Sequence, residues 1–424
     1  MATLTSADVP RLRQGFGGPA FDVDKIRADF PILAERVHGK PLVYLDSANT
    51  SQKPEAVLKA MDDYYRHANA NIHRATHLLS ERATALYEGG RAKAATFLNA
   101  PDPHTIVLTK GTTDGINLVA QSYGRATLKP GDEILLTWLE HHSNIVPWQM
   151  VAAQTGAAIK VVPINEAGEL DLDQYAALLS PRTRIVAVGH VSNALGTVNP
   201  IAAMIAQAHA AGAVVLVDGA QAAPHLVIDV QALDCDFYVL SSHKMFGPTG
   251  TGVLYGRAAL LEAMPPYQGG GDMIASVTFE KTLYNQVPYK FEAGTPNMAG
   301  VVGLGAAIDY LAGLDREAAL AHEDAVLDYL TAQVREIPGA RIVGEARHKT
   351  GVLSFVLDGV HPHDAGTILD QQGVAVRTGQ HCAQPVMDRF GIPATIRASL
   401  GMYNTREDID ALVRGLHKVR ELFV

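Results

Sequence analysis

The stretch DFYVLSSHKMFGPTGTGVLY, residues 236–255, decides how the rest of the chain is interpreted. Residues 236–240 are apolar and strand-like, residues 247–250 have the composition of a tight turn, and residues 251–255 begin a second strand. This pattern places Lys244 at the end of a buried strand. An amine held there can condense with a carbonyl compound to form an imine once its surroundings lower its pKa. The ordinary alternative is a solvated lysine, because most lysines lie on protein surfaces.

The composition is that of a compact enzyme. The chain has 424 residues, of which 47% are hydrophobic and 19% charged, and its net charge is −9. It contains no basic block and no long apolar run, so we expect neither nucleic acid nor a membrane as a partner. Its two cysteines, Cys235 and Cys382, lie far apart and form no CxxC pair. This excludes a disulfide framework or a cysteine-rich zinc site and predicts a cytoplasmic location.

From residue 105 onward, apolar strands alternate with helical segments. The strands are expected at residues 105–109, 133–137, 159–163, 184–190, 214–217 and 237–240. Unbroken apolar strands separated by crossovers indicate an α/β fold with a mostly parallel sheet that is covered on both faces. Ligands of such sheets bind beyond the carboxyl ends of the strands.

Polar residues follow those strand ends repeatedly. Thr112 and Thr113 follow a glycine at a helix start, where main-chain N–H groups bind phosphate. His141 and Asn193 follow two further strands, and Asp218 ends another. Each has an ordinary explanation by itself, since threonine also caps helices and aspartate also forms turns. Their recurrence at one predicted edge of the sheet points to a binding site.

A phosphate cradle, an amine, a carboxylate and an imidazole together describe a pocket for pyridoxal 5′-phosphate. Lys244 would hold the aldehyde, and Asp218 would keep the ring nitrogen protonated. Gln221 would hydrogen-bond the ring hydroxyl oxygen, and His141 would stack on the ring. No metal site is expected, because His141 and His142 are adjacent and lack the spacing of zinc-binding motifs.

Two clusters outside this set also carry chemistry. His73 and Arg74 lie in a polar break between two helical segments, where they would face an anion or form a solvated loop. Cys382 lies beside His381 and near Arg377, a basic setting that favours a thiolate. Cys235, in contrast, borders an apolar strand and is interpreted as a buried structural residue.

Nine segments, in order, carry a family resemblance: LDSANTSQKP, NIHRATHLLS, GTTDGINLVA, EHHSNIVPWQ, VSNALGTVNP, VDGAQAAPH, SSHKMFGPTGTGVLYG, FEAGTPN and RTGQHCAQPVM. They extend from about residue 21 to the C-terminus. The chain thereby resembles the cysteine desulfurase family of class V aminotransferases, in particular group II, the SUF-type desulfurases and cysteine sulfinate desulfinases. The resemblance implies the PLP-dependent transferase fold type I, with residues 21–298 as a large PLP-binding domain whose first residues pack on the small domain. Residues 299–424 would be a small α+β domain carrying the Cys382 loop, and residues 1–20 a flexible tail.

The same resemblance implies roles for individual residues. Lys244 would be the cofactor lysine, with Thr112, Thr113, Ser241 and His243 on the phosphate and Thr295 reaching it across a homodimer interface. The substrate-binding residues would be Asn193, Arg377, Arg397, His73 and Arg74. His141 would serve as a proton donor. The implied reaction converts L-cysteine to L-alanine and leaves a persulfide on Cys382, from which a SUF-type acceptor protein takes the sulfur for iron–sulfur cluster assembly or other sulfur biosynthesis.

Other reactions on the same cofactor remain open from the sequence. They are selenocysteine lyase, cysteine sulfinate desulfinase, and a kynureninase-like or epimerase activity; a non-catalytic sulfur-delivery scaffold is more remote. Cys382 favours desulfuration, because L-selenocysteine and L-cysteine sulfinate can lose their leaving groups without a thiol nucleophile. Gln380 departs from the histidine of many SUF-type members and resembles the desulfinase branch.

Overall fold

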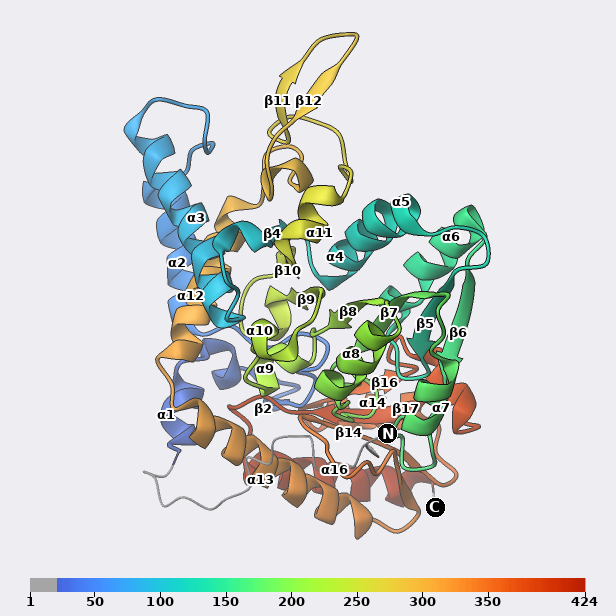
Figure 1. Cartoon of the computed structure of the whole chain (residues 1–424). Helices are drawn as coiled ribbons and strands as arrows, with labels where there is room; N and C mark the ends of the chain where they lie inside the picture. Colours follow the sequence, from blue (N-terminus) through green and yellow to red (C-terminus); the bar gives the residue numbers. More distant parts are fainter. Residues whose placement is uncertain (1–20, 424) are drawn as a thin grey trace.

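The computed structural model describes residues 21–423, so the predicted tail of residues 1–20 lies outside the described part of the chain. Its larger sheet has seven strands (Figure 1). In spatial order they are β4 (Ile106–Thr109), β10 (Gly252–Gly256), β9 (Phe237–Ser241), β8 (Val214–Asp218), β7 (Thr183–Gly189), β5 (Glu133–Thr137) and β6 (Ala158–Val162). β10 is antiparallel to both neighbours, and the other neighbouring pairs are parallel. The predicted mostly parallel α/β sheet is therefore confirmed.

Alternate residues of these strands enter two different cores. Ile134 and Leu136 of β5 pack in one cluster with Trp148, whereas Leu135 packs in another with Ile205. Successive residues of a strand point to opposite faces of the sheet, so a strand that is apolar throughout contributes side chains to the cores on both faces. The helices that contribute are α4 (Thr112–Val119) and α6 (Val146–Thr155) on one face and α8 (Ile201–Ala210) on the other.

A smaller antiparallel sheet follows later in the chain, below the larger one in Figure 1. Its order is β13 (Ala340–Val343), β14 (Val352–Leu357), β17 (Thr395–Ser399) and β16 (Arg377–Gly379). Its core also draws on α13 (Arg316–Arg335), α14 (Pro362–Gln371) and α16 (Arg406–Phe423). The composition of residues 377–383 predicts a loop throughout, which is wrong for residues 377–379. β16 exists because Arg377 and Thr378 pair with β17, a contact that local composition does not reveal.

The N-terminal segment joins this smaller sheet. The amphipathic pattern of residues 21–36 predicts one helix. The structure divides this segment into α1 (Val23–Ala28) and a 3₁₀ turn (Pro31–Ala34), because a proline cannot continue the helix. β3 (Val43–Tyr44) then pairs with β15 (Val374–Ala375), and Asp46 bridges to Ser399. Residues from both ends of the chain thus meet beside the same strands.

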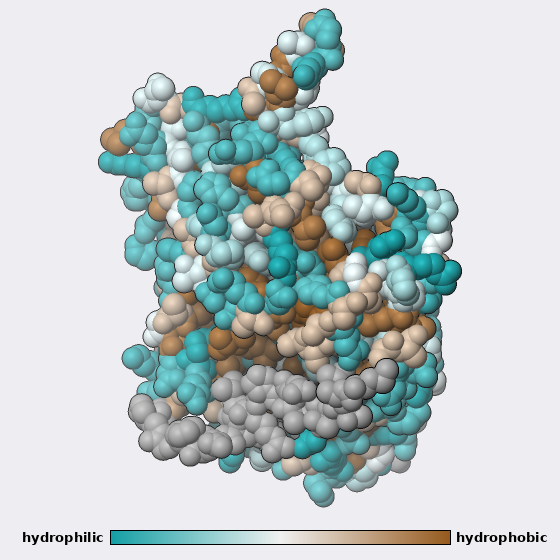
Figure 2. All heavy atoms as spheres, viewed as in Figure 1, coloured by the Kyte–Doolittle hydropathy of each residue, from teal (hydrophilic) through white to brown (hydrophobic). Residues whose placement is uncertain are grey.

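Helices and one hairpin complete the molecule. α12 (Met298–Ala312) packs along α2 (Glu55–His67) and α3 (Leu78–Phe97). The predicted domain boundary between residues 298 and 299 stays a prediction. The hairpin of β11 (Ile274–Val277) and β12 (Thr282–Tyr284) projects from the body, and hydrophobic side chains show on it in Figure 2. Phe279, at its tip, is fully exposed. The remaining elements are α5 (Arg125–Thr127), α7 (Leu172–Leu178), α9 (Ala222–His225), α10 (Val230–Leu233), α11 (Ala258–Ala263), α15 (Gln384–Arg389), β1 (Arg36–Val37) and β2 (Lys40–Pro41).

The length and the apolar composition of a helix decide whether it could span a membrane. No single helix within residues 21–423 is both long enough and apolar enough to cross a membrane. Helices α12 and α13 meet the criterion of length and composition only as a pair, and that pair is bent by 87°.

Candidate active site

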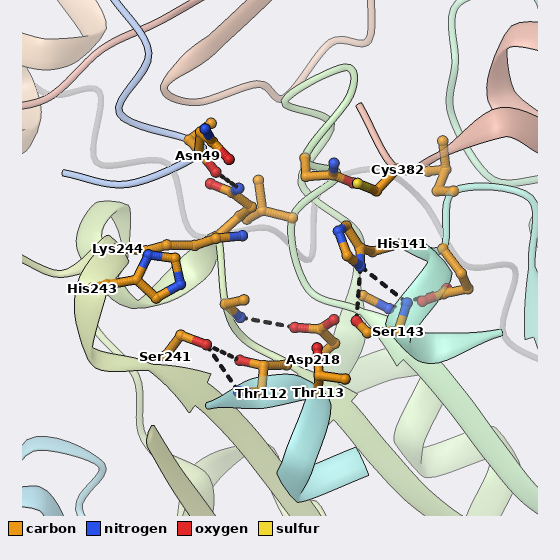
Figure 3. A pocket seen from close by; sticks show the side chains of 18 of the residues that line it. Asn49, Thr112, Thr113, His141, Ser143, Asp218, Ser241, His243, Lys244 and Cys382 are labelled. Carbon is orange, nitrogen blue, oxygen red and sulfur yellow. Dashed lines mark hydrogen bonds between the residues drawn. The ribbon is translucent and has the colours of Figure 1, made fainter. Parts of the chain in front are cut away.

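A cavity of about 220 Å³ lies beyond the carboxyl ends of the parallel strands (Figure 3). Eleven of the residues predicted for the site line it: Thr112, Thr113, His141, Asn193, Asp218, Gln221, Ser241, His243, Lys244, Arg377 and Cys382. The other lining residues are Ala48, Asn49, Leu139, Glu140, Ser143, Gly189, Val191 and Ala220. Asn49 and Ser143 lie in segments that had been noted for their resemblance to a family, but nothing in their local chemistry distinguished them.

Lys244 lies in a short 3₁₀ turn (Ser242–Lys244) that directly follows β9. Burial lowers the pKa of its amine to about 8, against the opposing charge of Asp218. Its backbone is held firmly, because the carbonyl of His243 accepts hydrogen bonds from Ser51 N at 2.9 Å and Lys53 Nζ at 3.0 Å. A fraction of the amine is therefore neutral near neutral pH, as a nucleophile or a base requires.

Asp218 ends β8 and is buried beside this amine. Burial raises the pKa of its carboxyl group, while the N–H of Ala220, at 2.9 Å, and the charge of Lys244 lower it. The carboxyl group is thus held in place at the cavity, where it could pair with a protonated ring nitrogen.

The N-terminus of α4 supplies the expected anion cradle. Ser241 Oγ accepts a hydrogen bond from Thr112 N at 2.9 Å and lies 2.8 Å from Thr112 Oγ1. Gly111 precedes the helix with φ of +148°, a conformation that disfavours other residues. The free N–H groups of the first helical turn therefore open onto the cavity next to Thr113, which is where a phosphate would bind.

His141 is a neutral imidazole. Burial, with the charge of Lys244 next in importance, lowers its pKa to about 3. Its Nδ1 accepts a hydrogen bond from Ser143 N at 3.0 Å, so the ring proton lies on Nε2. In this state the ring can stack on an aromatic cofactor and donate a hydrogen bond from Nε2.

Cys382 lies on a loop that the tertiary structure holds at several points. His381 and Cys382 both have φ of +54°, an unusual conformation for residues other than glycine. The N–H of His142 donates to the Cys382 carbonyl at 2.8 Å, and His142 Nε2 accepts from Gln384 N at 3.1 Å. Arg377 Nη2 lies 3.4 Å from the Cys382 sulfur. The thiol consequently faces the same cavity as Lys244 (Figure 3).

Several buried polar atoms at the site find no hydrogen-bond partner within residues 21–423. They are Gln221 Oε1, Asn193 Oδ1 and Arg397 Nε. Arg397 is fully buried, and its other nitrogens bind the Asn193 carbonyl at 2.9 Å and Asp46 Oδ1 at 3.1 Å. Because buried polar groups are normally paired, these atoms fit a site that receives a polar ligand.

Four predicted site residues do not line this cavity: the fully buried Arg397, and Thr295, His73 and Arg74. Thr295 is exposed on a separate loop. His73 and Arg74 line a second cavity of about 270 Å³. His73 Nε2 contacts Glu88 at 2.9 Å, and Arg74 contacts Asp272 at 3.0 Å, so nearby carboxylates already contact both side chains. Their predicted roles at the cofactor or substrate stay predictions.

The part of the chain described, residues 21–423, contains no group of three or more His, Cys, Asp or Glu residues placed to hold a metal ion.

Comparison with known proteins agrees with this geometry. Residues 43–412 match the family model for aminotransferase class V. A cysteine desulfurase of Dickeya dadantii is 53% identical over 95% of this chain and 98% of its own. This chain belongs to the cysteine desulfurase family of class V aminotransferases. The crystal structure of the cysteine desulfurase CsdA from Escherichia coli matches with a TM-score of 0.89 and 46% identity, over 96% of this chain and 100% of that one.

A third similar structure contains a bound cofactor. The structure of a C-DES mutant, with glycine covalently linked to its PLP cofactor, matches with a TM-score of 0.80 and 25% identity over 92% of this chain and 98% of that one. The cofactor of this desulfurase-family chain is pyridoxal 5′-phosphate. The half-buried Lys244, the buried Asp218, the α4 N-terminus and the unpaired Gln221 Oε1 all fit it.

Proposed function

We propose that this chain is a cysteine desulfurase that converts L-cysteine to L-alanine and takes the sulfur on Cys382. The observation that carries the proposal is that the Cys382 thiol and the Lys244 amine line one cavity, although they come from different sheets of the molecule. A lysine and a carboxylate would serve many reactions of this cofactor. A thiol in the same cavity is needed specifically by a reaction that must accept sulfur.

Different residues of the cavity would bind the cofactor, transfer protons and bind the substrate. Lys244, Asp218, Gln221 and the N-terminus of α4 would hold pyridoxal phosphate, which supplies an electron sink for bond changes at the substrate α- and β-carbons. The neutral Lys244 amine would take the Cα proton of the substrate. Lys244, protonated in that step, would return a proton to the substrate carbon, and His141 would donate a hydrogen bond from Nε2 beside it. Arg397 would bind the substrate carboxylate through its unpaired Nε, whereas the unpaired Oδ1 of Asn193 would accept a hydrogen bond from the substrate or the cofactor.

The sulfur step balances within these groups. The Cys382 thiolate attacks the substrate sulfur, so a new S–S bond forms while the Cβ–S bond breaks. The electron pair of the broken bond goes to carbon, which gains a proton and becomes the methyl group of L-alanine. The thiol of Cys382 is oxidised to a persulfide and the substrate carbon is reduced, so no outside oxidant is required.

Replacing the thiol tests the proposal. We expect Cys382→Ala to lose at least about 100-fold in cysteine turnover, because the nucleophile is absent, while it still binds the cofactor and retains activity on selenocysteine and cysteine sulfinate. After incubation with cysteine and no reductant, mass spectrometry of the unaltered protein should find an added sulfur on the Cys382 peptide and not on the Cys235 peptide. Sustained cysteine turnover by the variant, or sulfur found only on Cys235, would refute the assignment.

The same measurements decide the subgroup. Gln380 favours the desulfinase branch, and Cys382 favours desulfuration. A ratio of activities that strongly favours cysteine sulfinate in the unaltered protein would make this chain a desulfinase. We propose the SUF-type desulfurase as the better match, because Arg377 contacts the Cys382 sulfur directly.

We further propose a homodimer in the cytoplasm that passes its sulfur to an acceptor protein of the SUF type. Thr295 and the apolar tip of the β11–β12 hairpin are exposed on a single chain, which supports a second chain as their partner. Cys235 and Cys382 are both free thiols, which supports a reducing compartment. The half-buried Cys382, on a loop, is placed where a second protein can approach it.

A further inference from the structure

Asn49 lies on the segment between β3 and α2 and lines the cavity, yet it has no part in the chemistry described above. Its Oδ1 accepts a hydrogen bond from Arg377 Nη1 at 3.0 Å. Its Nδ2 donates to Asp46 Oδ2 at 3.3 Å. The oxygen and the nitrogen of the amide are therefore both hydrogen-bonded, and the bond to Asp46, on the same segment, sets the orientation of the amide. In Figure 3 Asn49 and Cys382 both lie in the upper part of the view, along one side of the cavity.

Arg377 is shared between this amide and the thiol. While Nη1 binds Asn49, Nη2 lies 3.4 Å from the Cys382 sulfur. Arg377 is only half-buried, so its long side chain loses considerable rotamer freedom when it is held in one orientation. A planar guanidinium with one nitrogen fixed has its second nitrogen directed as well. The bond to Asn49 therefore aims the other nitrogen at the sulfur.

We propose that Asn49 is a positioning residue, which holds Arg377 so that its guanidinium stabilises the Cys382 thiolate. This inference rests on the proposed function, since it concerns the same nucleophile. It adds a connection between two parts of the chain, because Asn49 precedes α2 and Cys382 lies near the C-terminus. Asn49 itself touches neither the sulfur nor the substrate in this arrangement.

The other charged and titratable groups around Cys382 do not replace Arg377. Arg397 is bound to Asp46, while burial lowers the pKa of His141 to about 3 and that of His381 to about 2, which leaves both rings neutral. The ring of His142 accepts from Gln384. Lys244 remains as a second cation that acts on the thiol, and Asn49 makes no contact with it in the hydrogen bonds described.

The experiment measures the reactivity of Cys382 without turnover. The cofactor-loaded protein is treated with iodoacetamide across a range of pH, and mass spectrometry follows alkylation of the Cys382 peptide, with the buried Cys235 as an internal reference. We expect Asn49→Ala to slow alkylation at neutral pH by about threefold to tenfold, because a charge-assisted contact to the thiolate is weakened. Gln149→Ala, which truncates an exposed amide on α6, is the matched control and should leave the profile unchanged.

A double-variant cycle decides whether Asn49 acts through Arg377. Arg377→Ala should slow alkylation at least as much as Asn49→Ala, and the double variant should equal Arg377→Ala alone. Arg377→Lys, which keeps the charge but has a single nitrogen, should also make the protein insensitive to Asn49→Ala. An unchanged profile for Asn49→Ala, or additive effects in the double variant, would overturn the proposal. Because alkylation needs no sulfur transfer, that outcome would leave the desulfurase assignment standing.

Discussion

At the scale of single residues, the reaction depends on Lys244, which lines the cavity and whose amine is half-neutral near pH 8. We expect Lys244→Ala to lower turnover by about 100-fold to 10,000-fold, the range for a lost acid–base group. Borohydride should attach the cofactor to the Lys244 peptide in the unaltered protein and to no peptide in the variant. Attachment to another lysine, checked by mass spectrometry, would show that the cofactor is held elsewhere.

The lowered pKa of Lys244 also makes a prediction about stability. Below pH 8 the amine is charged and buried in the folded protein, whereas the unfolded chain keeps its proton up to the ordinary value of 10.5. The folded state therefore becomes relatively more stable as the pH rises through this window. In cofactor-free protein, Lys244→Met should unfold with a free energy roughly 3 kcal/mol higher at pH 7, and this advantage should shrink by about 2 kcal/mol at pH 9.5. A constant difference in denaturant unfolding would show that the lysine has its ordinary pKa in the fold.

At the scale of an element, the Cys382 loop is held by contacts that its own sequence does not supply. The ring of His142 accepts the N–H of Gln384 at 3.1 Å, just beyond the thiol. We expect His142→Ala to speed hydrogen exchange of that amide by about tenfold, the effect of losing one net hydrogen bond. His417→Ala, at an exposed position on α16, serves as the control. If exchange of the loop is the same in both variants, His142 does not restrain it.

At the scale of the whole molecule, the position of Thr295 outside the Lys244 cavity leads to a test of the dimer. Light scattering should find twice the 45.3 kDa mass of one chain. Thr295→Ala should weaken cofactor binding by about tenfold if its hydroxyl reaches the neighbouring phosphate. In a hybrid of Lys244→Ala and Thr295→Ala chains, one site would combine an intact Lys244 with a Thr295 from its neighbour and bind the cofactor normally. If no site of the hybrid binds the cofactor normally, or if a monomer is fully active, Thr295 does not complete the neighbouring site.

Much of the site could be predicted because its signals are local. Asp218, Lys244 and Thr112 each follow an apolar strand directly, and parallel strands bring their carboxyl ends to one edge. The prediction was less accurate for a strand that depends on pairing with another strand and not on its own composition. Residues 377–379 have little strand character of their own, yet they form β16 beside β17. Pro31 ended a helix that the apolar pattern alone would continue.

The sequence by itself determined the sheet, the family and the residues that carry the chemistry, because strand period, glycine turns and motif order depend on neighbours along the chain. Only the tertiary structure decided which of those residues meet. It placed Cys382 across from Lys244, paired His73 and Arg74 with carboxylates at another cavity, and brought Asn49 to Arg377. Such contacts join segments far apart in the chain, and they form only when the packing of both sheets sets the distance and direction of each side chain.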